Sequence, residues 1–276
     1  MIGAIVGPVS RVSMMSTRAK KSSVNRSLLR GIEILRAFRP GSELLGNGDL
    51  AERTGLSRAT VSRLAQTLVE AGFLEHDRAQ RAYRLGAPVL SLGHAMRTGS
   101  SVLRIAAPMM TALAKRLRIN VGLAVRDRDD MVYLESIRMN ARGAQRSIVS
   151  GHRVPIELTS LGRAYLAVIA EPERAALLIR IKRQRVRQWP VLAREIADAA
   201  AHIMRKGYCH ASWQPDVVAL AAPVVIDGWP VYVLNVSVTT PARAATVVRA
   251  LERPLLELAE QFRQALTDAS EFDRGD

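Results

Sequence analysis

The chain has 276 residues, which is enough to bury a substantial core in one large or two ordinary domains. Its 40 Lys and Arg residues exceed its 25 Asp and Glu residues, and the net charge of +15 favours a polyanionic partner such as nucleic acid over a merely Arg-rich composition. A single cysteine excludes an internal disulfide and a Cys-based zinc cluster and suits a reducing cytoplasm, and no window approaches the ~18 uncharged apolar residues of a membrane span.

The chain is expected to begin with a disordered arm over residues 1–23, whose short apolar run precedes its basic residues, the reverse of a secretory signal. Apolar residues then recur at helical spacing and predict an amphipathic helix over residues 25–38. These residues are Val24, Leu28, Ile32 and Leu35.

Two further helices are predicted on either side of Gly55. The first is the short DLAERT, for which Asn47 can act as the N-cap, and the second runs from the N-cap Ser57 to about Ala71. A helix, a tight glycine turn and a helix with a polar outer stripe are typical of a helix-turn-helix, whose second helix lies in the major groove. The alternative is a helical hairpin that serves only packing.

A β-hairpin wing is predicted next, where FLEHDRAQRAYRLG holds two short strands around a charged turn. Residues 1–97 hold 15 Lys and Arg against 7 Asp and Glu, so positive charge is densest in this part of the chain. We therefore expect the outer helix face and the wing tip to contact double-stranded DNA. The residues expected to do so are Arg58, Ala59, Thr60, Ser62, Arg63, Gln66, Arg78 and Arg81.

Six blocks of the sequence resemble IclR-type bacterial transcriptional regulators, over nearly the whole chain after residue 23. They are VNRSLLRGIEIL, DLAERTGLSRATVSRLAQTLVEAGFLE, YRLGAPVLSLG, GHRVPIELTSLGRAYLA, RKGY and VALAAPVV. The resemblance implies an α+β chain with a winged helix-turn-helix domain, a linker helix and a larger GAF-like domain. In this family the larger domain binds a small effector and supports dimers and tetramers.

The domain boundaries are expected as follows. The winged helix-turn-helix domain covers residues 24–86, and a linker helix with a Gly-Ser-Ser hinge covers 87–101. The effector-binding and oligomerisation domain covers residues 102–270, and a disordered tail covers 271–276. The first helix of the effector-binding domain, over residues 102–117, is expected to bury Ile105, Met109, Ala112, Leu113 and Leu117.

The rest of the larger domain alternates between strands and helices. VGLAVRD and MVYLESIR predict one pair of strands, and VALAAPVVI and VYVLNVSV predict another. Helices are predicted near residues 161–170, 172–182 and 191–206, and Pro241 is expected to open a last helix that continues to about Leu266. Strands on both sides of a helical insertion predict a mixed sheet with flanking helices.

One face of VYVLNVSVTT is a candidate effector site. Asn235, Ser237 and Thr239 share this face, and three polar side chains in a core strand need a ligand, ordered water or bulk solvent as partner. Ala219 on the neighbouring strand is small enough to leave volume open.

A helix N-terminus in GHRVPIELTSLGRAYLA is a second candidate wall of this site. Thr159 or Ser160 caps the helix, and the amides that follow can bind a carboxylate at its positive end. The resemblance places this block and the segment after RKGY around the pocket. The residues it implies are Ser160, Leu161, Gly162, Cys209 and His210.

The sequence departs from the family pattern at one edge of that pocket. The family usually has an acidic stretch and a glycine before the block that matches VALAAPVV, whereas this chain has CHASWQPD. Cys209, His210 and Trp213 would then form an unusual edge. This edge favours an aromatic organic acid over a small oxoacid as effector.

No cofactor or metal site is expected, because the sequence has no GxGxxG, P-loop or HExxH motif. An enzyme that depends on Cys209 and His210 is the least favoured alternative, since adjacent residues seldom point together. A non-regulatory nucleic-acid-binding protein is the other, although 4% aromatic residues are few for RNA. The sequence thus predicts a cytoplasmic regulator that binds a pseudo-palindromic operator as a homodimer or homotetramer, and it leaves repression or activation open.

Overall fold

The structure, a computed structural model, describes residues 24–139, 149–214 and 216–272. The arm expected at 1–23 and the last four residues of the expected tail lie outside these ranges. The chain folds as two compact units. One takes in residues up to Phe38 together with Leu44–Leu85, and the other takes in Arg39–Glu43 together with the chain from Gly86 onward.

The first unit packs helices against a small antiparallel sheet with the strand order β1-β3-β2. Its elements are α1 (Arg26–Ala37), β1 (Leu45–Gly46), α2 (Asn47–Thr54), α3 (Arg58–Glu70), β2 (Leu74–Asp77) and β3 (Ala82–Leu85). Four fully buried residues join the three helices in one core. They are Ile34, Leu50, Val61 and Ala65.

Helix α1 turns a different face to the core than its apolar spacing suggests. The helix buries Ile34 and Ala37, whereas Val24, Leu28 and Ile32 are exposed. The spacing predicted the helix but not its buried face, because only the C-terminal end of α1 packs against this core.

The start of α2 also differs from expectation. Gly46 rather than Asn47 is the N-cap, and the Asp49 carboxylate accepts a hydrogen bond of 2.9 Å from the Gly46 amide. An acidic side chain three residues after the cap commonly reaches back in this way. Asn47 therefore lies inside the first turn of α2 and caps nothing.

The second unit is built on a sheet that contains six of the described strands, in the order β6-β5-β4-β9-β8-β7. Its elements are α4 (Ala87–Thr98), α5 (Ser101–Leu117), β4 (Asn120–Asp127), β5 (Asp130–Arg138), β6 (Arg153–Pro155), α6 (Ser160–Val168), α7 (Glu171–Gln184), α8 (Trp189–Lys206), β7 (Cys209–Ala211), β8 (Val217–Val224), β9 (Tyr232–Thr239) and α9 (Ala244–Phe272). Every neighbouring pair is antiparallel, whereas strands of mixed direction were expected. The two hairpins β4–β5 and β8–β9 pair through β4 and β9, which keeps all directions alternating.

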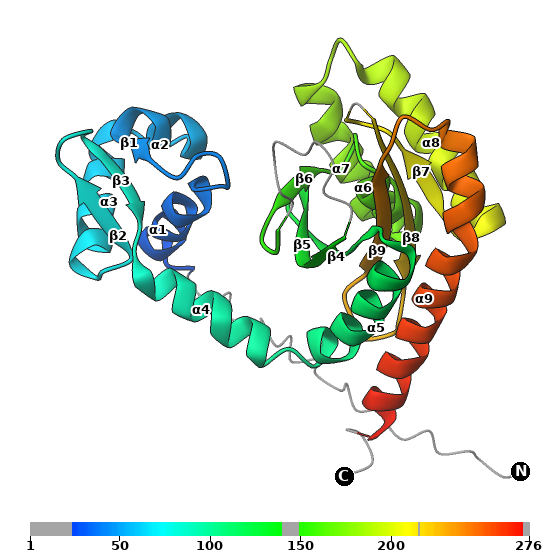
Figure 1. Cartoon of the computed structure of the whole chain (residues 1–276). Coiled ribbons are helices and arrows are strands. Elements are labelled where there is room, and N and C mark those ends of the chain that lie inside the picture. Colours follow the sequence, from blue (N-terminus) through cyan, green and yellow to red (C-terminus); the bar gives the residue numbers. More distant parts are fainter. Residues whose placement is uncertain (1–23, 140–148, 215, 273–276) are drawn as a thin grey trace, which may run out of the picture. The chain divides into compact units, whose positions relative to one another are not determined.

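Helices cover both faces of this sheet (Figure 1). Helices α5 and α9 cover one face over a core that includes Leu220 and Val236, and α6 and α8 cover the other over a core that includes Leu161 and Val233. No helix in the described ranges combines the length and hydropathy that a membrane span requires.

Two helices of this unit correct the sequence expectations. Helix α5 buries Leu113 as expected, and Ile105, Met109 and Leu117 pack partly buried against the same core. The expected core residue Ala112 is exposed, and Ala106, Met110 and Ala114 are more deeply buried. Helix α9 begins at Ala244 instead of Pro241 and continues through Phe272, two residues into the expected tail.

The linker helix α4 buries no side chain, and its C-terminal end is tied to β5. Arg97 donates hydrogen bonds to the Leu134 carbonyl at 2.8 Å and to the Glu135 carboxylate at 2.6 Å. Burial opposes ionisation of Glu135, but the hydrogen bonds from Arg97, the Ser136 amide and Ser150 lower its pKa. The last turn of α4 is thus anchored before the hinge.

Candidate functional site

Helix α3 is positioned by its cap and by the turn before it. Gly55 has a φ of 69°, the left-handed conformation that glycine adopts most readily, and the Ser57 hydroxyl accepts a hydrogen bond of 3.3 Å from the Thr60 amide. Val61 and Ala65 fix the inner face in the core. The opposite face exposes Arg58, Ala59, Ser62, Arg63 and Gln66.

Thr60 is placed differently from the other residues expected to contact DNA. Its side chain is half-buried, and its hydroxyl lies 3.0 Å from that of Ser57, where it takes part in the cap. Thr67, which was not predicted, is exposed one turn after Arg63. Helical spacing from Arg63 was the signal that could have identified it.

The wing places Arg78 and Arg81 at an exposed tip, as expected. Strands β2 and β3 pair with His76 opposite Tyr83, and Asp77 closes the turn by accepting a hydrogen bond of 3.0 Å from the Gln80 amide. This bond, more than the neighbouring Arg84 guanidinium, lowers the pKa of Asp77. Arg84 is paired with Asp77, whereas Arg78 and Arg81 form no ion pair with another described residue.

The sheet face under α6 gathers the polar residues of β9. The strand register sets Ser237 between Ala219 and Asn120, and Asn120 in turn lies opposite Arg138 of β5. On the next row, Asn235 is buried, and its side-chain oxygen has no hydrogen-bond partner within the described residues. A buried acceptor of this kind is costly unless a ligand or water donates to it.

Gly122 makes room for the most buried part of this face. A Cβ at this position would overlap the Asn235 side-chain oxygen and the ring of Tyr133. Burial raises the pKa of Tyr133 to about 12, although a hydrogen bond that the Asn235 amide nitrogen donates to the phenol oxygen and the charge of Arg138 oppose the shift. The phenol therefore stays protonated and can donate at neutral pH.

Arg138 was missed by the sequence analysis, and a β-bulge is the reason. Leu123 of β4 pairs with Glu135 and Ala124 pairs with Tyr133, so Leu134 of β5 has no partner. The side chains of β5 after Leu134 therefore lie on the opposite face from the one that simple alternation predicts. Without the bulge, Arg138 would face away from Tyr133. No signal in the sequence marks this reversal.

The N-terminus of α6 closes the same side of the sheet. Thr159 is the cap: its hydroxyl accepts a hydrogen bond of 3.2 Å from the Gly162 amide and donates one of 2.9 Å to the Pro155 carbonyl. The Gly162 amide is therefore occupied, which leaves the amides of Ser160 and Leu161 as the ones without a partner among the described residues. A Cβ on Gly162 would overlap the Ile156 backbone, so a glycine is required there.

Strand β7 separates Cys209 from His210. Cys209 is buried on the α6 side, and its thiol lies 3.4 Å from the Ser160 carbonyl oxygen. Burial raises the pKa of this thiol to about 12. His210 alternates to the other side, is exposed and pairs in register with Leu220, so it lies apart from the group around Ser160. The two residues do not form a thiol-imidazole pair.

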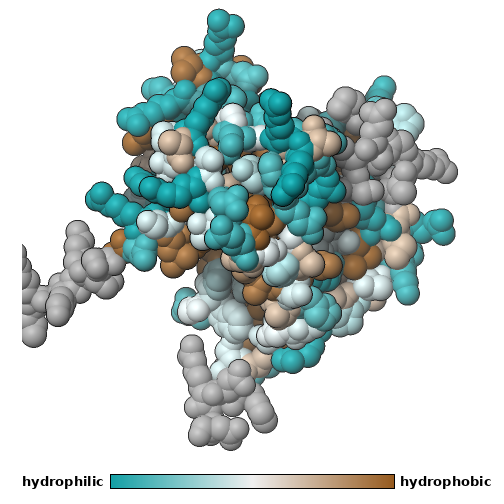
Figure 2. Space-filling model, turned by 90° about the vertical axis from the view of Figure 1, so that its left-hand side faces the viewer, coloured by the Kyte–Doolittle hydropathy of each residue, from teal (hydrophilic) through white to brown (hydrophobic). Residues whose placement is uncertain are grey.

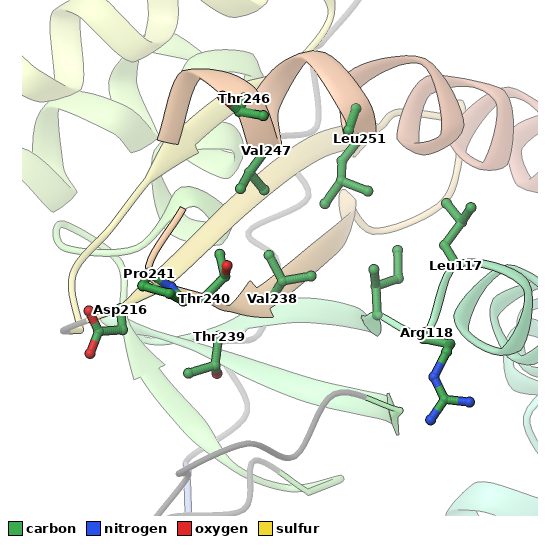
Figure 3. A pocket seen from close by; sticks show the side chains of 12 residues that line it. Leu117, Arg118, Asp216, Val238, Thr239, Thr240, Pro241, Thr246, Val247 and Leu251 are labelled. Atoms are coloured by element: carbon green, nitrogen blue, oxygen red, sulfur yellow. The ribbon is translucent and has the colours of Figure 1, made fainter. Parts of the chain in front are cut away.

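Thr239 lies at the end of β9, at the margin of the polar face. It lines an open cavity of about 570 Å³ between the end of β9 and the start of α9. Figure 3 shows Val238, Val247 and Leu251 along this cavity and Thr239 pointing to the other side of β9. This cavity belongs to the face covered by α5 and α9, so it is distinct from the region around Ser160.

Comparison with known proteins gives matches over both units. The IclR helix-turn-helix domain matches residues 27–78, and the bacterial transcriptional regulator IclR C-terminal domain matches residues 94–270. The HTH-type transcriptional regulator TsaQ1/TsaQ2 of Comamonas testosteroni is 39% identical over 184 residues, which are 66% of each chain. The match thus spans just under two thirds of that relative's length.

Two solved structures have the same architecture. An IclR family transcriptional regulator from Brucella abortus superposes with a TM-score of 0.78 and 31% identity, over 91% of this chain and 96% of that one. An IclR homologue from Microbacterium hydrocarbonoxydans, complexed with 4-hydroxybenzoate, has a TM-score of 0.64 and 22% identity over 88% and 99%. At that identity the second likeness concerns the fold alone.

Proposed function

The chain belongs to the IclR family of bacterial transcriptional regulators, and we propose that it binds a pseudo-palindromic operator whose occupancy a small organic acid controls. The observation that carries DNA readout is the capped helix α3, with Val61 and Ala65 buried on one face and Arg58, Ser62 and Arg63 exposed on the other. Side chains on such a face can reach base edges and phosphates in the major groove. In this proposal residues 24–86 bind DNA, and residues 102–270 bind the effector and oligomerise.

The small size of the DNA-binding unit supports a dimer or tetramer. One winged domain makes too few contacts for nanomolar specificity, whereas two copies related by a two-fold axis bind two half-sites. Leu28 of α1 and Leu90 and Met96 of α4 are exposed apolar side chains. They support contacts between copies, because burying apolar surface against another copy is more favourable than leaving it in water.

The polar face under α6 supports an organic acid as effector. Arg138 and the amides of Ser160 and Leu161 offer positive charge to a carboxylate, and Asn235 offers an unpaired acceptor to a hydroxyl donor. In this proposal the small side chain of Ala219 allows a ligand to approach β8, and Cys209 and Trp213 are the neighbouring apolar residues that suit an aromatic ring. A hydroxylated aromatic acid combines these features.

DNA binding is tested by isolating the genomic fragments that the full-length protein binds and measuring affinity for the recovered operator. Arg63→Ala should weaken operator binding by about 1 to 3 kcal/mol without unfolding the protein, because the side chain points away from the core. Unchanged affinity in a folded variant would contradict the assignment of α3. A thermal-shift series with benzoate, 4-hydroxybenzoate and glyoxylate tests the effector class, since only a ligand of the folded state raises the melting temperature.

A further inference from the structure

The densest positive charge of the second unit lies around the turn between α7 and α8. Residues 180–194 contain six Lys and Arg residues and no Asp or Glu, whereas residues 98–276 together hold 25 Lys and Arg against 18 Asp and Glu. This short segment thus accounts for most of the unit's excess charge. The six residues are Arg180, Lys182, Arg183, Arg185, Arg187 and Arg194.

Two of these cations fix the segment to the domain beneath it. The Arg180 guanidinium lies 2.9 Å from the Asp129 carboxylate in the β4–β5 turn. Arg185 lies 2.8 Å from the carboxylate of Glu157, whose side chain is only 7% exposed. The ion pairs therefore hold the turn in place, and they do not neutralise its remaining cations.

Lys182, Arg183 and Arg187 are exposed and form no ion pair with another described residue. Lys182 and Arg183 lie in the last turn of α7, where cations interact favourably with the helix dipole. Arg187 lies two residues before α8 begins at Trp189, where a cation faces the positive end of a helix. Helix stability therefore does not account for the three together.

We propose that Lys182, Arg183 and Arg187 bind phosphates of duplex DNA outside the base pairs that α3 reads. Unpaired cations grouped on one surface are the usual partners of the phosphate backbone, and such contacts carry no sequence information. Hydrophilic side chains project at the upper end of Figure 2, where the α7–α8 turn of Figure 1 lies. The contact adds to the operator recognition proposed above and does not depend on which bases α3 reads.

The partner could instead be an acidic protein surface, since Ile179 and Val186 are exposed beside these cations. Duplex DNA is favoured because residues 180–194 contain no acidic residue and the family already has DNA as its ligand. A salt titration of DNA binding distinguishes the two partners, because only a phosphate contact made by these cations contributes to its slope.

The test uses the full-length protein and a duplex of about 60 base pairs of generic sequence, with affinity measured over a range of salt concentrations. The variant Lys182→Ala/Arg183→Ala/Arg187→Ala should reduce the slope of log K against log salt by about 2 to 3, because each phosphate contact releases about 0.9 counterions. The matched control is Lys115→Ala/Arg116→Ala/Arg249→Ala, which removes the same charge from exposed positions of α5 and α9. The control should keep the parent slope, and circular dichroism should show both variants folded.

Equal slopes for the parent and the α7–α8 variant would overturn the proposal, and so would equal losses in the two triple variants. Loss of regulation in cells with an unchanged slope would also overturn it and would assign the surface to a protein partner. Arg63→Ala on the recovered operator tests α3 separately, so failure of operator recognition and failure of the phosphate contact are distinguishable.

Discussion

The thiol of Cys209 lies 3.4 Å from the backbone carbonyl oxygen of Ser160, and this contact joins the edge strand β7 to the first turn of α6. Both residues are almost completely buried, so the thiol is a small packing group here and not a nucleophile. Burial disfavours the thiolate, which makes the contact sensitive to alkaline pH.

Alkaline pH should destabilise the protein partly through Cys209. The thiol of the unfolded chain ionises near its ordinary pKa of 9, whereas the folded chain retains the proton up to about 12. Between these values the unfolded state binds fewer protons, so the free energy of unfolding falls as the pH rises. Urea unfolding of Cys209→Ala should show a shallower fall above about pH 9 than the parent. Parallel curves would contradict the buried, protonated thiol.

Gly122→Ala should destabilise the second unit by about 1 to 3 kcal/mol, because a Cβ would force apart Asn235 and the ring of Tyr133. Gly31→Ala is the matched control, since Gly31 lies in α1 with no atom near the position of the added methyl group. The control should be neutral or stabilising by up to about 1 kcal/mol through helix propensity. Thermal unfolding of both variants measures the difference, and similar melting temperatures would argue against the close approach.

Arg81→Ala should weaken binding to all duplex sequences alike and lower the salt slope by about one, because the wing tip contacts phosphates in our proposal. Alanine is the suitable replacement, since Arg81 has a φ of 50° and both residues carry the same Cβ in that conformation. Gln80→Ala in the same turn removes a side chain without charge and should leave the slope unchanged. A loss confined to one operator sequence would speak for base recognition instead.

Ser237→Val should reduce affinity for the effector by about 1.5 to 3 kcal/mol if the hydroxyl bonds a charged ligand, while operator binding without ligand stays near the parent value. Thr246→Val removes a hydroxyl at the cavity of Figure 3 and serves as the control. Titration of both variants with the acid that stabilises the parent measures the two affinities. Equal affinities for Ser237→Val and the parent would place the effector elsewhere.

The DNA-binding unit was more predictable from sequence than the polar face. Ser57, Gly55 and Val61 act within one local motif, and each has a conformational requirement that the residue type reveals. The α6 face depends on strands far apart in the chain, and a single skipped residue at Leu134 decides which side Arg138 takes. The buried face of α1, and the position of Ala112 in α5, were predicted wrongly for a related reason, since several rotations of an apolar helix satisfy the same spacing.

Around the bulge at Leu134, three consecutive residues of β5 contact two different helices, α6 and α4. Tyr133 lies under α6 beside Asn235, while the Leu134 carbonyl and the Glu135 carboxylate hold Arg97 of the linker helix. Neighbouring residues of one strand therefore belong to both the polar face under α6 and the contact that holds the last turn of α4.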